Sequence, residues 1–177
     1  MFKYKEYILR KPIKKDTTGF YKISHDKKVN KYYGTMGTNF KDINEAEKQV
    51  KWCIDQFNNN AGRWIIITES DNNYIGDIGF HDYVNNHNRV EFGYRLFSEY
   101  WNKGIITNFT KQLVEWGFND LKYNRIEAIV DVRNEASKKV LLKNNFILEG
   151  TLRQYEFENN GYVDLEMYSL LKDDFYH

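Results

Sequence analysis

The chain has 177 residues and a formal net charge of +1, with 26 Lys and Arg against 25 Asp and Glu. This length fits one domain with a normal hydrophobic core, and the near-neutral charge predicts neither a nucleic acid nor a membrane surface as partner. A single cysteine and four scattered histidines exclude an internal disulfide and a cysteine-based zinc cluster, so we expect no metal site.

The first residues, 1–6, contain no apolar run of signal-peptide length. No window of the chain reaches the roughly 18 apolar residues of a membrane-spanning helix. We therefore expect a cytoplasmic protein.

The first third of the chain predicts one strand and two helices. Residues 4–10 alternate loosely and precede a proline, which is typical of a strand, and the weakly periodic stretch 16–33 is expected to be helical and to end near Gly34. A clearer helix begins after Asp42, which is followed three residues later by a glutamate, as in a capping box. Cys53 lies beside the apolar stripe of that helix without a recognisable basic partner, so we expect a core thiol rather than a nucleophile.

The middle of the chain predicts an antiparallel meander followed by a helix. The strand-like runs are separated by short clusters of Asn, Asp and Ser, and they cover residues 63–68, 74–83 and 89–97. Apolar residues then recur at helical spacing over 106–119.

The remainder predicts a strand, a helix and a hairpin. Residues 125–132 form the strand, and Asn134 is the expected N-cap of a helix that reaches about residue 144. Because strand, helix and strand alternate here, we expect one parallel strand pair. The last two strands, 146–157 and 162–171, are joined by Asn-Asn-Gly, a hairpin signal.

The segment 98–107 joins a predicted strand to a predicted helix and is suited to hold an anion. The first N–H groups of a helix lack intrahelical partners and carry a partial positive charge. Lys103 adds a full charge, Gly104 lets the backbone approach a ligand closely, and no acidic residue follows before Glu115. A diphosphate is one ligand that fits, although an isolated glycine before a helix is also a common turn residue.

The motifs and their order resemble the GNAT superfamily of acyl-CoA-dependent N-acyltransferases. Residues 91–96 and 99–104 resemble that family's fourth strand and pyrophosphate loop, with Gly104 on the central glycine. Residues 134–137, 146–153 and 161–164 resemble the RimJ/RimL branch, which acetylates the N-termini of ribosomal proteins.

The resemblance implies one mixed α/β domain over residues 1–177. Its sheet would be mostly antiparallel and twisted, with about seven strands, a splayed parallel pair formed by the fourth and fifth strands, and about four flanking helices.

Acetyl-CoA is the co-substrate that the resemblance implies, with no metal ion. Leu96 and Phe97 would pair with its pantetheine arm through their backbone groups, and Asn134 would touch its amide arm while capping a helix. The remaining cofactor-binding residues would be Trp101, Asn102, Lys103, Gly104, Ile105, Ile106 and Thr107. Ile106 stands where the family has Gly or Ala, so it predicts a tilted helix start or a cofactor that is shifted outward.

Catalytic roles also follow from the resemblance. Leu141 stands where many relatives have the tyrosine that protonates the leaving thiolate, and Ser137, one turn earlier, matches a serine that the RimJ/RimL branch places beside the sulfur. Its alternative role is that of an ordinary first-turn helix residue. Glu156 matches a proposed base acting through water, and Glu91 matches a residue that binds or activates the amine in other branches. The remaining alternative is that both carboxylates are merely solvated.

The acceptor is expected to be a primary amine. An α-amine is about 10% neutral at pH 7 and a Lys amine below about 0.1%, so a site without an evident strong base favours a protein or peptide N-terminus. A small amine such as a polyamine, an amino sugar or an antibiotic is the alternative, and a degenerate acyl-CoA-binding module is a third. An open groove beside the final hairpin would indicate a peptide, and a closed acidic pocket a small amine. The chain is expected to be a monomer or a homodimer.

Overall fold

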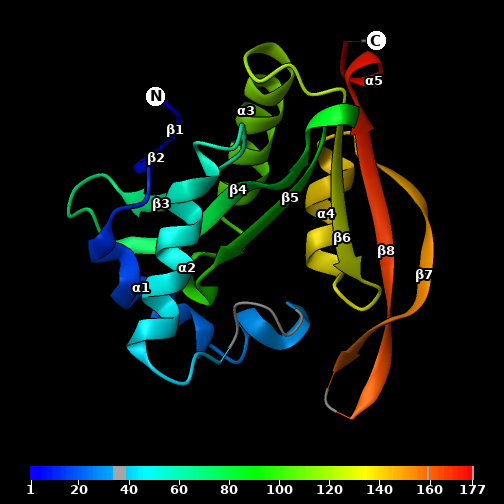
Figure 1. Ribbon diagram of the computed structural model, residues 1–177. Helices are drawn as coiled ribbons and strands as arrows, with labels where there is room; N and C mark the ends of the chain where they lie inside the picture. Colours follow the sequence, from blue (N-terminus) through cyan, green and yellow to red (C-terminus); the bar gives the residue numbers. More distant parts are fainter. Residues whose placement is uncertain (34–38, 159, 177) are drawn as a thin grey trace.

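The computed structural model describes residues 1–33, 39–158 and 160–176 (Figure 1). The strands are β1 (Lys3–Tyr4), β2 (Tyr7–Arg10), β3 (Gly62–Thr68), β4 (Tyr74–Val84), β5 (Arg89–Leu96), β6 (Arg125–Asp131), β7 (Ile147–Glu158) and β8 (Gly161–Leu171). The α-helices are α1 (Thr17–Ser24), α2 (Ile43–Gln56), α3 (Ile105–Asn119), α4 (Glu135–Lys143) and α5 (Lys172–Tyr176).

The strands form one mixed sheet. Among the described residues it has eight strands in the order β1-β2-β3-β4-β5-β6-β8-β7. The pair β5–β6 is parallel, as predicted, and the other neighbouring pairs are antiparallel. This confirms the mixed α/β class and the meander of β3, β4 and β5.

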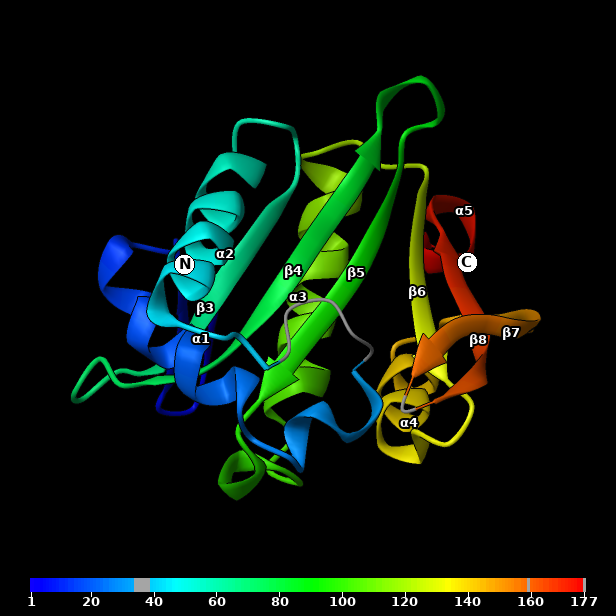
Figure 2. The same ribbon diagram turned by 60° about the horizontal axis from the view of Figure 1, so that its bottom comes forward.

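Two layers of helices cover the sheet. Figure 2 shows α1 and α2 in front of it and α3 behind. The middle of β3 explains how both layers are held, because successive side chains of a strand point to opposite faces. Ile65 and Ile67 pack with Phe20 and Val50 on the α1/α2 side, whereas Ile66 joins the core under α3. No helix in the described ranges combines the length and apolar character needed to cross a membrane.

The N-terminal strand prediction was wrong in one respect. Residues 4–10 are not one strand, because the backbone turns at Lys5, which has φ 51°, and forms the β1–β2 hairpin. This turn adds a strand to the expected count. The short α5 at the other end adds a helix, with Asp173 and Asp174 in its first turn, where acidic side chains favour helix formation.

The predicted helix 16–33 is interrupted. α1 ends at Ser24, and Asp26 then accepts hydrogen bonds from the N–H groups of Lys28 and Val29, which starts a separate 3₁₀ turn over Val29–Tyr32. This is the local competition that Asp side chains offer to a continuing helix. The expected end near Gly34, and Asn159 in the final hairpin turn, lie outside the described residues.

Helix α2 begins at its predicted cap. The Asp42 carboxylate accepts hydrogen bonds from the N–H groups of Asn44 at 2.8 Å and Glu45 at 3.1 Å. The Glu45 carboxylate turns back to the N–H of Lys41, so only half of the predicted capping box is present. Cys53 of this helix is completely buried, and burial raises the pKa of its thiol to about 12. It is a core thiol, as expected.

The parallel pair β5–β6 is short. It runs from Arg89 opposite Arg125 to Glu91 opposite Glu127. Beyond Glu91 the two ribbons diverge, as Figure 2 shows, while each strand keeps its other neighbour. The expected splay is therefore present, and it begins directly after Glu91.

Candidate active site

The loop before α3 forms an anion cradle. Gly104 is the N-cap of the helix in the left-handed conformation, with φ 77°, and the first turn contains no acidic residue. The N–H groups from Ile105 to Thr107 begin the helix and have no intrahelical acceptor. A Cβ on Gly104 would lie 3.1 Å from the hydroxyl of Tyr4, a tight contact, and the left-handed backbone at this position favours glycine. With exposed Lys103 beside it, this cradle fits a diphosphate.

The other loop residues divide between anchoring and exposure. Trp101 donates a hydrogen bond from Nε1 to the carbonyl of Leu96 at 2.7 Å and thereby fixes the loop to β5. Asn102 is exposed and has φ 59°. Ile105 and Ile106 are 1% and 8% exposed and belong to the core. The Ile106 side chain therefore points away from the solvent-facing end of the helix and does not crowd the cradle.

The edge of β5 that faces the splay differs from the expectation. Phe97 donates its N–H to the carbonyl of Ile75 at 2.9 Å, and its own carbonyl accepts from the N–H of Tyr100. Backbone groups of alternate residues in a strand point to opposite sides, so the groups of Tyr94 and Leu96 face the splay instead. A strand-like ligand along this edge would meet the backbone groups of Tyr94 and the N–H of Leu96, because the Leu96 carbonyl already accepts from Trp101. The backbone groups of Phe97 are engaged with Ile75 and Tyr100, so the assignment to Phe97 is corrected.

A cavity of about 610 Å³ passes through the splay. On the α4 side its wall includes Tyr94, Asn134, Ser137 and Leu141. On the α1/α2 side its wall includes Trp52, Arg63, His81, Glu91, Glu156 and Glu158. The structure thus brings the three predicted catalytic residues Glu91, Ser137 and Glu156, and the predicted cap Asn134, to one cavity that is lined from both faces of the sheet.

The start of α4 holds the proposed leaving-group side of this cavity. The Asn134 side chain accepts a hydrogen bond from the N–H of Ser137 at 3.2 Å, which confirms the predicted cap. The Ser137 hydroxyl in turn lies 3.1 Å from the hydroxyl of Tyr94. Leu141 is completely buried and lines the cavity one turn further along the helix.

The two candidate bases lie in environments that favour the protonated carboxyl. Burial raises the pKa of Glu91, and the charges of Asp82 and Glu127 act in the same direction, whereas His81 opposes them. Burial also raises the pKa of Glu156, followed by the charges of Glu158 and Glu91. Each carboxylate therefore holds a proton more tightly than an ordinary glutamate and is a better match to an amine.

His81 lines the cavity although the sequence does not single it out, because the four histidines are scattered along the chain. It is the register partner of Glu91, and its Nε2 lies 4.0 Å from the Glu91 carboxylate. The register between His81 and Val84 contains an irregularity. Counting back regularly from the turn would place Asp82, not His81, opposite Glu91, so only the bulge brings the imidazole there.

His81 also lies beside Asp82, 3.1 Å from Nδ1. His81, Asp82 and Glu91 bring possible metal-ligand atoms within 4.8 Å of one another. The nearest carboxylate differs between the two ring nitrogens, with Asp82 at Nδ1 and Glu91 at Nε2.

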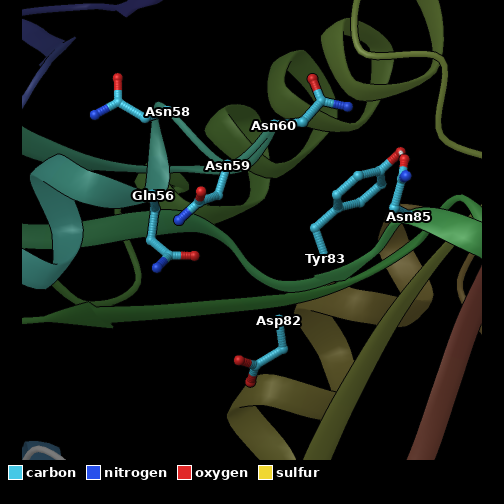
Figure 3. Close-up of a pocket in the computed structure, with 7 residues that line it drawn as sticks. All are labelled: Gln56, Asn58, Asn59, Asn60, Asp82, Tyr83 and Asn85. Carbon is cyan, nitrogen blue, oxygen red and sulfur yellow. Dashed lines mark hydrogen bonds between the residues drawn. The ribbon is translucent and has the colours of Figure 1, made fainter.

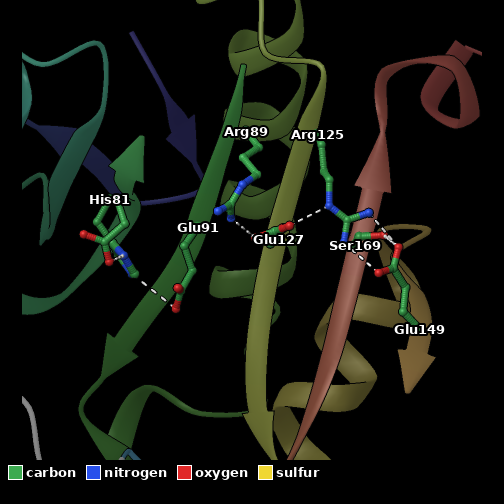
Figure 4. A network of polar contacts seen from close by, with 8 residues as sticks. His81, Arg89, Glu91, Arg125, Glu127, Glu149 and Ser169 are labelled. Atoms are coloured by element: carbon green, nitrogen blue, oxygen red, sulfur yellow. Dashed lines mark hydrogen bonds and ion pairs between the residues drawn. The ribbon is translucent and has the colours of Figure 1, made fainter. Parts of the chain in front are cut away.

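A network of ion pairs closes the sheet at the paired end of the splay, as Figure 4 shows. Arg89 on β5 contacts Glu127 on β6 at 2.9 Å, and Arg125 contacts the same carboxylate at 2.6 Å. Arg125 also makes a bidentate contact with Glu149 on β7, with its two terminal nitrogens 2.6 and 2.7 Å from the carboxylate oxygens. The hydroxyl of Ser169 on β8 donates a hydrogen bond to the same carboxylate. Four strands are therefore tied together where the parallel pairing ends.

A second cavity, of about 480 Å³, lies near the end of α2 (Figure 3). Amide side chains dominate its wall, which consists of Gln56, Asn58, Asn59, Asn60, Asp82, Tyr83 and Asn85. It contains none of the predicted site residues. The residues of interest for chemistry therefore gather in the larger cavity.

Comparisons with known proteins identify the family of the chain. Residues 7–147 match the family described as "Acetyltransferase (GNAT) domain". The chain is 34% identical over 166 residues to the "Uncharacterized N-acetyltransferase YoaA" of Bacillus subtilis (strain 168), covering 93% of each protein. It is 33% identical over 99 residues to the ribosomal-protein-serine acetyltransferase of Escherichia coli (strain K12), covering 56% of this chain and 55% of that protein.

A solved structure shares the fold. The spermidine N-acetyltransferase from Vibrio cholerae, in complex with CoA and spermine, superposes with a TM-score of 0.83 at 19% identity, covering 97% of this chain and 99% of that one. Together with the cradle and the cavity, these matches show that the chain belongs to the GNAT family of acetyltransferases and is an N-acetyltransferase that uses acetyl-CoA as its co-substrate.

Proposed function

We propose that this enzyme acetylates the α-amino group of a protein or peptide N-terminus. The observation that carries the proposal is the shape of the acceptor side of the cavity. Tyr155 and Glu156 line it from β7, and Tyr155 is 55% exposed, so the cavity reaches the surface along the final hairpin. The rest of a peptide acceptor, beyond its N-terminal residue, can extend out of the cavity at this place. The similarity to a ribosomal-protein-serine acetyltransferase and the RimJ/RimL-like motifs support the same class of acceptor.

The character of the lining also suits an amine. The ring of Trp52 lies 6.1 Å from the ring of His81, and Glu91 and Glu156 lie in the same wall. Aromatic faces and carboxylates attract a protonated amine. Glutamates with a raised pKa are bases of modest strength, which is sufficient for an α-amine of pKa near 8 but poor for a Lys amine near 10.4.

Acetyl transfer requires one proton to leave the amine and one to reach the sulfur. Bound acetyl-CoA supplies the activated acetyl group: a C–N bond forms, the C–S bond breaks, and its electron pair remains on sulfur. In the proposed mechanism Glu156 accepts the amine proton through a water molecule, with Glu91 holding the amine beside His81. Ser137, on the α4 side, donates a proton to the sulfur. The cavity allows these separate roles because residues from both faces of the sheet line it.

A small polyamine is the second candidate acceptor. The observation that favours it is the number of acidic residues in the cavity wall, namely Asp82, Glu91, Asp131, Glu156 and Glu158. A spermidine N-acetyltransferase also shares the fold. Against it, two buried arginines, Arg63 and Arg95, line the same cavity. They share the carboxylate of Asp77, and the one positive charge that remains reduces the attraction of the cavity for a polycation.

The test is an acceptor panel assayed for release of free CoA and for the mass of the product. It contains peptides that begin with Ser or Ala and carry an internal Lys, the same peptides with a blocked N-terminus, and spermidine. We expect turnover of the unblocked peptides, with one acetyl group on the α-amine, and no turnover of the blocked ones. Equal turnover of blocked and unblocked peptides, or a kcat/KM for spermidine tenfold above that of any peptide, would overturn the proposal.

A further inference from the structure

Tyr94 on β5 touches the cavity at the point where the predicted proton donor lies. We propose that Tyr94 is a positioning residue for Ser137. Tyr94 orients the serine hydroxyl toward the departing sulfur and replaces the proton that the serine gives up. This inference rests on the proposed role of Ser137 in acetyl transfer.

The contact between Tyr94 and Ser137 places a phenol hydroxyl beside the serine on the leaving-group side of the cavity. The Tyr94 hydroxyl lies 3.1 Å from Ser137 Oγ and 3.4 Å from the Ser137 carbonyl oxygen, and both residues line the cavity. Ser137 and Leu141 are four residues apart on α4, so they share one face of the helix. A phenol is therefore present on this side of the cavity, although it comes from β5 and not from position 141.

The direction of the hydrogen bond leaves the serine ready to donate. The one proton of Tyr94 has two acceptors within reach, Ser137 Oγ at 3.1 Å and the Ser137 carbonyl oxygen at 3.4 Å, and in the proposed arrangement it goes to the nearer Oγ. A serine hydroxyl has one proton and two acceptor positions. By accepting from Tyr94, Ser137 keeps its own proton for a group in the cavity. Without such a partner, a serine near the start of a helix can donate its proton to a backbone carbonyl three or four residues earlier. That proton is then not available for the reaction.

The chemistry also explains why a second hydroxyl is useful. An aliphatic alcohol is a very weak acid, whereas a phenol is a much stronger one, with an ordinary pKa near 10. When the Ser137 proton moves to sulfur, the Tyr94 proton moves to Ser137 Oγ, so no serine alkoxide accumulates. The phenolate then regains a proton from cavity water, and Glu156 returns to water the proton that it accepted from the amine. Every proton is accounted for within the reaction.

Burial keeps the phenol protonated in the resting enzyme. It raises the pKa of Tyr94, so the hydroxyl begins each turnover with its proton, and its transfer to Ser137 Oγ has to accompany the transfer from Ser137 to sulfur because a free phenolate is disfavoured there. The ring packs beside Phe92, with 6.0 Å between ring centroids, which holds the hydroxyl in place. Removal of the hydroxyl alone should therefore leave this packing intact.

The experiment is a double-mutant cycle with Tyr94→Phe, Ser137→Ala and the combined variant, measured by single-turnover acetyl transfer to an Ala-initiated peptide. We expect Tyr94→Phe to lower the rate about 10- to 100-fold without changing acetyl-CoA affinity, within the range of acid–base assistance. Because Tyr94 acts through Ser137, the combined variant should be no slower than Ser137→Ala. Tyr123→Phe is the control, since Tyr123 is a buried tyrosine that donates to the carbonyl of Asn60 at 2.6 Å.

A second measurement follows the protons in transfer. In mixtures of light and heavy water, the rate of the unaltered enzyme should depend on deuterium content with stronger curvature than the rate of Tyr94→Phe, which lacks one moving proton. Additive losses in the cycle, an unchanged rate for Tyr94→Phe, or equal curvature in the two proteins would each overturn the role of Tyr94. Full activity of Ser137→Ala would overturn it together with the proposed role of Ser137. Acetylation of the peptide N-terminus is read separately from the product mass and survives either result.

Discussion

Glu91 of β5 and Glu127 of β6 are paired in register at the last position before the two parallel strands separate. The neighbouring carboxylates have different partners. Glu127 contacts Arg89 at 2.9 Å and Arg125 at 2.6 Å, whereas Glu91 faces His81 at 4.0 Å in the cavity (Figure 4). The arginines bind Glu127 into the sheet, and its negative charge contributes to the raised pKa of Glu91. One member of the pair is structural, and the other is available for chemistry.

Substitution of Glu127 should loosen the closed end of the splay. Its side chain is only 13% exposed. Glu127→Gln removes the charge and leaves Arg89 and Arg125 with a weaker partner, so we expect a loss of about 1–2 kcal/mol in the free energy of unfolding. Urea unfolding measures it. Asp55→Asn is the control, because the Lys51–Asp55 pair is largely exposed and should change stability by less than about 0.5 kcal/mol. Equal effects of the two variants would contradict the structural role of Glu127.

Glu156→Gln tests the base directly. The amide keeps the shape of the side chain and removes its basicity, so kcat/KM should fall about 100-fold near neutral pH while acetyl-CoA affinity barely moves. The loss should shrink as the pH approaches the pKa of the acceptor amine, which is then already neutral in solution. The pH–rate profiles of both proteins measure this. A raised KM for the amine with kcat preserved would show an anchoring role, and a profile like that of the unaltered enzyme would favour Glu91 as the base.

Glu158 should influence the pKa of the candidate base Glu156 through its charge. Its charge is the largest influence after burial that raises the pKa of Glu156. Glu158→Gln removes a negative neighbour, which stabilises ionised Glu156, so the acid limb of the kcat/KM profile should move to lower pH. Glu115→Gln, on the exposed side of α3, serves as the control and should leave the profile in place. A shift to higher pH in Glu158→Gln would mean that the acid limb does not report Glu156.

The cradle is tested by replacing Gly104 with Asp and with Asn, two side chains of nearly equal shape. Gly104 has φ 77°, a conformation that Asn and Asp tolerate better than other side chains. Gly104→Asp adds strain and a negative charge among the phosphate oxygens, whereas Gly104→Asn adds strain alone. We expect Gly104→Asp to weaken acetyl-CoA binding at least tenfold, or about 1.4 kcal/mol, and Gly104→Asn to weaken it less. Calorimetric titration decides, and unchanged affinity in folded Gly104→Asp would place the diphosphate elsewhere.

Glu149 should make stability depend on pH in the acid range. Its hydrogen bonds with Arg125, and then with Ser169, lower the pKa of the carboxyl from 4.5 to about 2. Because the folded-state pKa is depressed, the stabilisation is present above about pH 4.5 and is lost as the pH falls toward 2. The side chain is 41% exposed, so solvent screening reduces the effect. Urea unfolding of Glu149→Gln should show a smaller loss of stability on acidification than the unaltered protein, and parallel losses would contradict this linkage.

Local signals in the sequence determined most of the elements and the family. Turn-forming clusters separate the strands of the meander, the Asp42 and Asn134 caps mark two helix starts, and Gly104 marks the cradle. These signals act over a few residues, where backbone geometry and side-chain hydrogen bonding decide the conformation. The same local chemistry explains the misses, since the turn at Lys5 and the Asp26 turn interrupt stretches whose apolar pattern continues.

Tertiary structure decided which of these residues meet. The bulge in β4 shifts the register by one residue and brings His81, not Asp82, opposite Glu91, and such a shift has no signal in either strand alone. The hydrogen bond of Phe97 to Ile75 decides that Tyr94 and Leu96 face the splay. The contact between Tyr94 and Ser137 spans 43 positions of sequence and exists only because β5 and α4 flank one cavity. Pairing across the sheet sets these distances, and no local sequence pattern encodes them.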